Sequence, residues 1–104
     1  MSDATRAPEA SHTTLRILNL LMRHFAHGIT NKDIAQALGL QPSAVTRHVQ
    51  ALEEEGYAER IPETGRIRPS VRHAQACFGV LQGLDTAVGR MTELKTRITT
   101  PNLS

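Results

Sequence analysis

The stretch that decides the fold is NKDIAQALGLQPSAVTRHVQALEEEGY, from Asn31 to Tyr57. It predicts two short helices joined by a turn. The first helix is capped by Thr30 or Asn31 and closes at Gly39, a residue type suited to the left-handed end of a helix. The second helix is expected to start at Pro42, because proline at the first helical position loses no hydrogen bond, and to end at about Glu55.

The second helix has two different sides. Val45, Val49 and Leu52 recur at helical spacing and predict a buried stripe. The polar residues off this stripe are Gln41, Ser43, Thr46, Arg47 and Gln50. This pattern predicts a helix-turn-helix whose second helix enters the major groove of double-stranded DNA. Arg47 is then the best candidate for a base contact, since its guanidinium fits guanine O6 and N7, whereas Ser43 and Thr46 are expected to bind phosphate.

Working outward, residues 57–61 and 66–69 predict two strands around a turn at residues 62–65. Such a hairpin beside a helix-turn-helix is a wing. Arg66 and Arg68 share one face by strand alternation, and they are predicted to contact the phosphate backbone or the minor groove. The alternative is a solvated hairpin edge on which positive charge discourages aggregation. Lys32, at the start of the first short helix, is a further candidate phosphate contact.

Before the decisive stretch, a first helix is predicted from between Ser11 and Thr14 to about Ala26. Ile29 is expected in a short extended piece after Gly28. The residues of the first helix expected to face the core are Leu15, Leu18, Leu21, Met22 and Phe25.

After the wing, a helix is predicted from Ser70 to about Ile98. Its apolar residues alternate at spacings of four and three, which suggests a coiled-coil dimerisation seam. The predicted seam is Cys77, Leu81, Leu84, Val88 and Met91. Glycines in this helix leave two alternatives: a short, broken helix, or a helix whose packing against a partner offsets their cost. The expected organisation is a disordered tail at 1–10, a winged helix-turn-helix domain at 11–70, a dimerisation helix at 71–98 and a tail at 99–104.

The composition limits the size of the core and the class of protein. The 104 residues are 39% hydrophobic but only 3% aromatic, so the core must be mostly aliphatic and oligomerisation is expected to add stability. The net charge of +2 says little alone, but residues 60–72 hold four arginines against Glu63. No apolar run is long enough to span a bilayer, and there is no signal-peptide pattern, so no membrane association is expected. The single cysteine allows no internal disulfide and favours the cytoplasm.

The segment TTLRILNLLMRHFAHGITNKDIAQALGLQPSAVTRHVQALEEEGYAERIPETGRIRPS is similar to the N-terminal winged-helix domain of IclR-family transcription regulators. LRIL, GIT, DIAQALGL and ALEEEGYAER carry the resemblance, which covers about residues 13 to 72. The resemblance implies DNA contacts at Ser43, Thr46, Arg47 and Arg66. Members of that family carry a large C-terminal effector domain, whereas about 32 residues follow the wing in this sequence, so ligand sensing is not carried over. Small regulators of this build are common in bacteria and phages.

Three classes of function come into question. The first is transcription regulation by a homodimer that binds an inverted repeat and is expected to act as a repressor. The expected fold is mainly α, a winged helix-turn-helix with a small β-hairpin wing. The alternative is a protein-interaction adaptor, to which four acids between Glu53 and Glu59 would attract a basic partner. An enzyme is rejected, because no catalytic arrangement or cofactor motif is present. His73 and Cys77 have ligand spacing on a helix, but no second ligand pair is evident, so no metal is expected.

Overall fold

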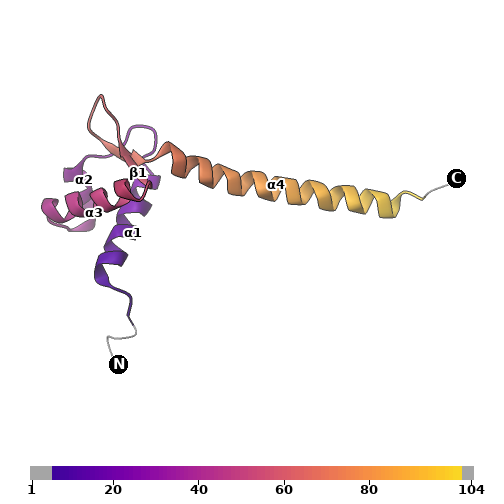
Figure 1. Cartoon of the computed structure of the whole chain (residues 1–104), viewed down its shortest axis with the longest axis horizontal. Coiled ribbons are helices and arrows are strands. Elements are labelled where there is room, and N and C mark those ends of the chain that lie inside the picture. Colours follow the sequence, from indigo (N-terminus) through magenta and orange to yellow (C-terminus); the bar gives the residue numbers. More distant parts are fainter. Residues whose placement is uncertain (1–5, 102–104) are drawn as a thin grey trace. The chain divides into compact units, whose positions relative to one another are not determined.

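The computed structural model describes residues 6–101 and divides the chain into two compact units after His73. We call the described residues up to His73 the head. The head contains α1 (Glu9–Met22), α2 (Asn31–Leu38), α3 (Pro42–Glu54), β1 (Ala58–Arg60) and β2 (Ile67–Pro69), and α4 (Val71–Thr99) follows (Figure 1). The predicted fold class is confirmed: a mainly helical winged helix-turn-helix with a two-stranded hairpin and a long C-terminal helix.

The core of the head is aliphatic, as its composition requires. α1 packs on α2, α3 and β2, and α3 also packs on β1. The apolar side chains with no exposed surface are Ile17, Leu21, Ile34, Val45, Val49 and Ile67. These residues come from all three head helices and from the wing, so the hairpin is part of the same core.

The predicted inner face of α1 was partly wrong. Leu21 is fully buried and Leu18 packs at the edge of the core, but Leu15 is 58% exposed and Met22 is 42% exposed. Ile17 and Leu20 are buried instead. α1 carries two apolar stripes at helical spacing, and periodicity alone does not say which one meets the other helices.

The ends of α1 also differ from the prediction. The helix begins at Glu9, inside the predicted tail, and ends at Met22 rather than near Ala26. Phe25 therefore lies in the turns that follow and is 38% exposed. The other parts of the two predicted tails, residues 1–5 and 102–104, lie outside the described residues.

The turn between α2 and α3 follows local rules closely. Thr30 Oγ1 accepts a hydrogen bond of 3.1 Å from the backbone N–H of Asp33, which caps α2. Gly39 adopts φ 66°, ψ 40°, and the N–H of Leu40 then donates to the carbonyl of Ala35 at 2.9 Å. Pro42 opens α3 as predicted.

The wing is a short antiparallel hairpin in which Ala58, Glu59 and Arg60 face Pro69, Arg68 and Ile67. Each strand is three residues long, shorter than predicted. Ile29 joins as an isolated bridge, exchanging two backbone hydrogen bonds of 2.9 Å with Ile67. This bridge is the expected extended piece, and it ties the wing to the turn after α1.

α4 starts one residue later than predicted, because Ser70 serves as its cap. The Ser70 hydroxyl donates to the carbonyl of Gly56 at 2.7 Å and accepts the N–H of His73 at 2.9 Å. The helix is 29 residues long, or ~44 Å at the usual helical rise. It contains no buried residue. Among residues 6–101, no helix is both long and apolar enough to cross a membrane.

Candidate nucleic-acid interface

The exposed face of α3 lies opposite its buried stripe. Val45, Val49 and Leu52 are at most 4% exposed and anchor the helix on the core. At about 100° per residue, Ser43, Arg47 and Gln50 point to the other side, and they are exposed. Thr46 is exposed at the edge of this face, and Gln41 is exposed at its start. The five polar side chains singled out from the sequence are thus accessible on or beside one helix surface.

Two of these side chains already have partners within α3. The Thr46 hydroxyl donates to the carbonyl of Pro42 at 3.1 Å, and Gln50 Nε2 donates to Glu54 Oε2 at 3.3 Å. Within the described part of the chain, Arg47 has no ion pair or side-chain hydrogen bond. Its guanidinium is therefore available to a ligand without breaking an internal contact.

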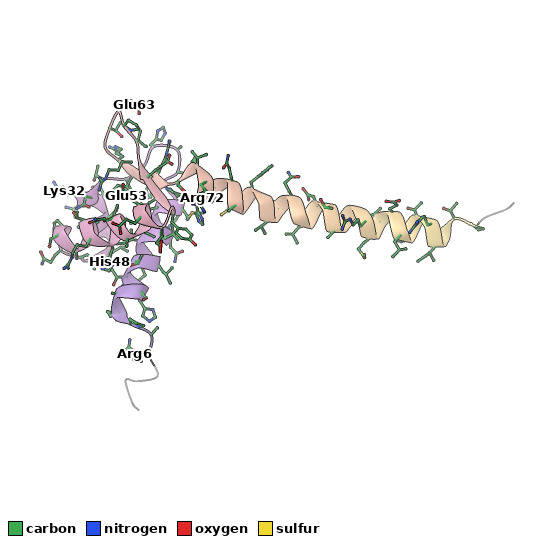
Figure 2. All side chains as sticks on the ribbon, in the orientation of Figure 1. Arg6, Lys32, His48, Glu53, Glu63 and Arg72 are labelled. Atoms are coloured by element: carbon green, nitrogen blue, oxygen red, sulfur yellow. The ribbon has the colours of Figure 1, made fainter. Side chains whose placement is uncertain are left out.

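Asn31, expected from the sequence only as a possible helix cap, joins the two helices of the motif. Asn31 Nδ2 donates to the carbonyl of Pro42 at 3.1 Å and so links the first turn of α2 to the first turn of α3. Lys32, the next residue, is exposed on α2 at the same end of the motif (Figure 2). Asn31 is visible in the sequence as a polar residue at the start of α2. Its contact with Pro42 is not, because the distance between the two residues depends on the angle between the helices.

The two arginines expected to act together in the wing have different surroundings. Arg68 Nη2 lies 2.8 Å from Glu59 Oε2, and its Nε donates to the same oxygen at 2.9 Å. The guanidinium carbon also lies 5.7 Å from the centre of the Phe25 ring. Arg68 thus has its charge balanced by a cross-strand acid and lies beside an aromatic ring.

Arg66 is exposed, by contrast, next to the tip of the wing. Its backbone N–H donates to Thr64 Oγ1 at 3.2 Å, while its side chain makes no ion pair among residues 6–101. Arg60 supports the loop from beneath, donating to the carbonyl of Gly65 at 3.4 Å and lying 3.7 Å from Glu53. Glu63 lies at the tip (Figure 2). Arg66 is therefore the wing cation that remains open to an anionic ligand.

The histidine and cysteine side chains do not gather into a metal site. The ring of His73 meets that of Tyr57 at 5.0 Å in an edge-on arrangement. Cys77 is exposed on α4. Over residues 6–101, no group of three or more His, Cys, Asp and Glu side chains is placed to hold a metal ion.

The five predicted seam residues are all exposed on α4. Leu81 and Leu84 are 58% and 59% exposed, and Val88 and Met91 are each 64% exposed. Cys77 is exposed as well. The stripe of residues that the spacing identified therefore lies on the surface of α4.

Part of the head matches a known protein family. Residues 11–59 match the family described as winged helix-turn-helix DNA-binding. The match covers α2 and α3 completely, and it leaves out the first two residues of α1 and the last residue of β1. Among solved structures, a mutant of ZitR from Lactococcus lactis is similar with a TM-score of 0.48 and 22% identity, covering 96% of this chain and 66% of that chain. No curated protein matches the chain.

Proposed function

We propose that this protein binds double-stranded DNA in a sequence-specific manner and regulates transcription. The observation that carries the proposal is the exposed face of α3, where Arg47 is unpaired and flanked by Ser43 and Gln50, opposite a fully buried anchor. The match of residues 11–59 to winged helix-turn-helix DNA-binding domains supports it. We also propose that the protein is cytoplasmic and that its head is of the IclR type. The second of these proposals rests on the sequence motifs.

The contacts divide by chemistry. Arg47 reads a guanine in the major groove, and Gln50 reads a neighbouring base with the polar atoms that Glu54 leaves open. Ser43, Thr46 and Gln41 bind the phosphate backbone from the start of α3. Lys32 and Arg66 bind phosphates on either side. Arg68 contributes by holding the wing in place, because Glu59 neutralises its charge.

The working form is proposed to be a homodimer joined through the exposed stripe of α4. Leu84 and Val88 are more than half exposed in the single chain, and a second copy would remove them from water. A dimer presents two recognition helices, so the operator is an inverted repeat with half-sites about 34 Å apart. Repression by blocking polymerase is the simplest mechanism, and it requires no cofactor or small-molecule effector.

The adaptor alternative has less support. It relied on a free acidic cluster, but Glu59 is bound to Arg68 and also accepts the N–H of Val71 at 3.1 Å. Glu53 lies near Arg60. Two of the four acids thus already pair with arginines, which reduces the charge available to a basic protein.

The test is DNA selection followed by binding measurements on the full chain. A random duplex pool is selected for binding, and the enriched duplex and its scramble are compared by fluorescence anisotropy at two salt concentrations. Arg47→Ala should weaken binding to the enriched duplex by about 1–3 kcal/mol and relax the preference at one base position. Arg16→Ala removes an exposed arginine of α1 and is the matched control.

Two results would overturn the proposal. No sequence enrichment, together with equal and steeply salt-dependent binding to both duplexes, would show phosphate contact without specificity. No binding to either duplex at low salt would favour the adaptor. An Arg66→Ala protein tests the role of the wing. Loss of one phosphate contact should weaken binding to all duplexes alike, and it should lower the slope of log affinity against log salt concentration by about one.

A further inference from the structure

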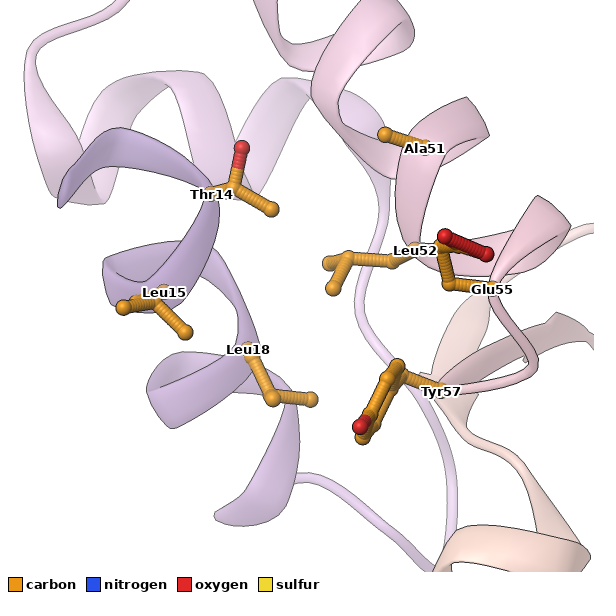
Figure 3. A pocket seen from close by; sticks show the side chains of 7 residues that line it. All are labelled: Thr14, Leu15, Leu18, Ala51, Leu52, Glu55 and Tyr57. Carbon is orange, nitrogen blue, oxygen red and sulfur yellow. The ribbon is translucent and has the colours of Figure 1, made fainter. Parts of the chain in front are cut away.

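A shallow apolar groove runs between α1 and α3 on the head. Its lining consists of Thr14, Leu15, Leu18, Ala51, Leu52, Glu55 and Tyr57 (Figure 3). The cavity measures about 280 Å³. We call it the α1–α3 groove. It lies within the head, and the side of α3 that lines it adjoins the side that carries Arg47, because Ala51 follows Arg47 by about one helical turn.

The groove is open rather than enclosed. Leu52 is only 4% exposed, whereas Leu15 is 58% and Tyr57 is 43% exposed. The hydroxyl of Thr14 already has partners, since it lies 2.7 Å from His48 Nδ1 and donates to the carbonyl of Ala10 at 2.9 Å. A pocket for a small molecule encloses most of its ligand. This open apolar surface is better suited to the side chains of a helix.

We infer that the α1–α3 groove receives the C-terminal third of α4 from a second copy of this chain, with the two α4 helices running antiparallel. The inference rests on the homodimer proposed above and deepens it by naming the second surface of the interface. It accounts for three features of α4 and the head that a simple pair of α4 helices leaves unexplained.

The first feature is the width of the apolar surface on α4. The seam at Cys77, Leu81, Leu84, Val88 and Met91 is a single stripe with two residues in every seven. Next to it runs a third row made of Val80, Ala87 and Leu94, which come one residue before Leu81, Val88 and Lys95. Two-stranded coiled coils usually have charged residues in that row, whereas a helix facing a broader core has apolar ones. Val80 is 65% and Leu94 is 41% exposed, so this row also lacks a cover.

The second feature is charge. Residues 53–55 are three glutamates at the C-terminal end of α3, of which Glu53 lies near Arg60 and Glu54 accepts from Gln50. Glu55 lines the groove and makes no ion pair among the described residues. Residues 90–99 of α4 contain Arg90, Lys95 and Arg97 against Glu93 alone. A basic helix end therefore complements the acidic rim of an apolar groove.

The third feature is connectivity. Tyr57 forms one wall of the groove, and its ring contacts that of His73 in the first turn of α4. In an antiparallel pair, the last third of one helix lies beside the first turns of the other. The partner's basic end is then next to the groove, whereas a parallel pair would carry it away along the helix.

The first experiment measures dimerisation of the full chain by sedimentation equilibrium. Leu15→Gln is expected to raise the dimer dissociation constant at least tenfold. Met22→Gln, also on α1 and exposed but outside the groove, is expected to change it less than twofold. Far-UV circular dichroism melts establish that both variants fold. If Leu15→Gln matches Met22→Gln in an otherwise intact dimer, the groove inference fails and the α4 dimer stands. A wild-type chain that stays monomeric overturns the inference and the homodimer together.

A charge exchange tests the occupant of the groove. Glu55→Lys alone and Lys95→Glu with Arg97→Glu are each expected to dimerise at least fivefold more weakly than wild type. Mixing the two proteins should restore near wild-type affinity, since each groove then meets a helix end of opposite charge. Failure of the mixture to recover would overturn the inference. DNA binding is measured separately, so its loss or retention does not decide this test.

Discussion

The head and α4 differ in how far their apolar side chains are buried. In the head, six apolar side chains from three helices and the wing have no exposed surface. In α4, no residue is buried, and Leu84, Val88 and Ile98 are 59%, 64% and 73% exposed. The head is therefore stabilised by contacts within its own chain. The C-terminal helix has the composition of an interface, but none of its residues is fully buried among the described residues.

The glycines of α4 strengthen this contrast. Gly79, Gly83 and Gly89 lie inside the helix, and each costs about 1 kcal/mol relative to alanine. Long isolated helices in water are marginal even without such residues, and tertiary packing normally provides the difference. A helix with this composition is expected to depend on a partner surface, which the head does not require.

The largest effect is expected from opening the core of the head. Leu21→Ala should lower the free energy of unfolding by about 2–5 kcal/mol, because it leaves a cavity at a fully buried position. Leu84→Ala removes the same atoms from an exposed position of α4 and should leave the unfolding of the head nearly unchanged. Urea unfolding followed by tyrosine fluorescence isolates the head, since Tyr57 is the only tyrosine. Equal losses in the two variants would remove the distinction between the regions.

A charge in the seam is expected to act on association instead. Leu84→Lys should raise the dimer dissociation constant tenfold to a hundredfold, or about 1.4–2.8 kcal/mol, because it places an ammonium group in an apolar interface. Gln82→Lys adds the same charge on the opposite side of α4 and should change the constant little. Sedimentation equilibrium measures both. A dimer equally tolerant of both lysines would place the interface elsewhere.

Glycine-to-alanine changes should have opposite signs in the two regions. Gly39→Ala should destabilise the head by about 1–2 kcal/mol, since φ is 66° and alanine disfavours this conformation even though no atom lies within 4 Å of the added Cβ. Gly79→Ala meets no neighbouring atom either, and it should raise helix stability by about 1 kcal/mol. Thermal melts followed by far-UV circular dichroism compare them. Two changes of the same sign would contradict the assignment of the turn or of the helix.

The smallest effect concerns the junction between the wing and α4. Glu59→Gln should cost about 0.5–1 kcal/mol, because it weakens the pair with Arg68, whose side chain is 26% exposed and screened by solvent. Glu63→Gln, at the wing tip, is the matched control and should be neutral. Urea unfolding at low and high salt measures the difference, which should shrink as salt rises. A cost that is independent of salt would mean that the hydrogen bonds outweigh the charge.

Arg68 and Arg66 show how far the candidate site was accessible from sequence. Alternation predicted that both lie on the face opposite Ile67, which is fully buried. The predicted hairpin already places Glu59 opposite Arg68, so their pairing could be expected from the sequence. The contact of Arg68 with Phe25 could not, because no local rule brings these two residues together.

By itself, the sequence determined the elements whose cause is local. Thr30, Gly39 and Pro42 act through the backbone of their own turns, and the stripe of Val45 and Val49 needs only the helical repeat. Only the tertiary structure decided which stripe of α1 is buried, that Arg68 lies beside Phe25, and that Asn31 links α2 to α3. These outcomes depend on distances between segments remote in the chain, because packing selects one arrangement among several that local preferences allow equally.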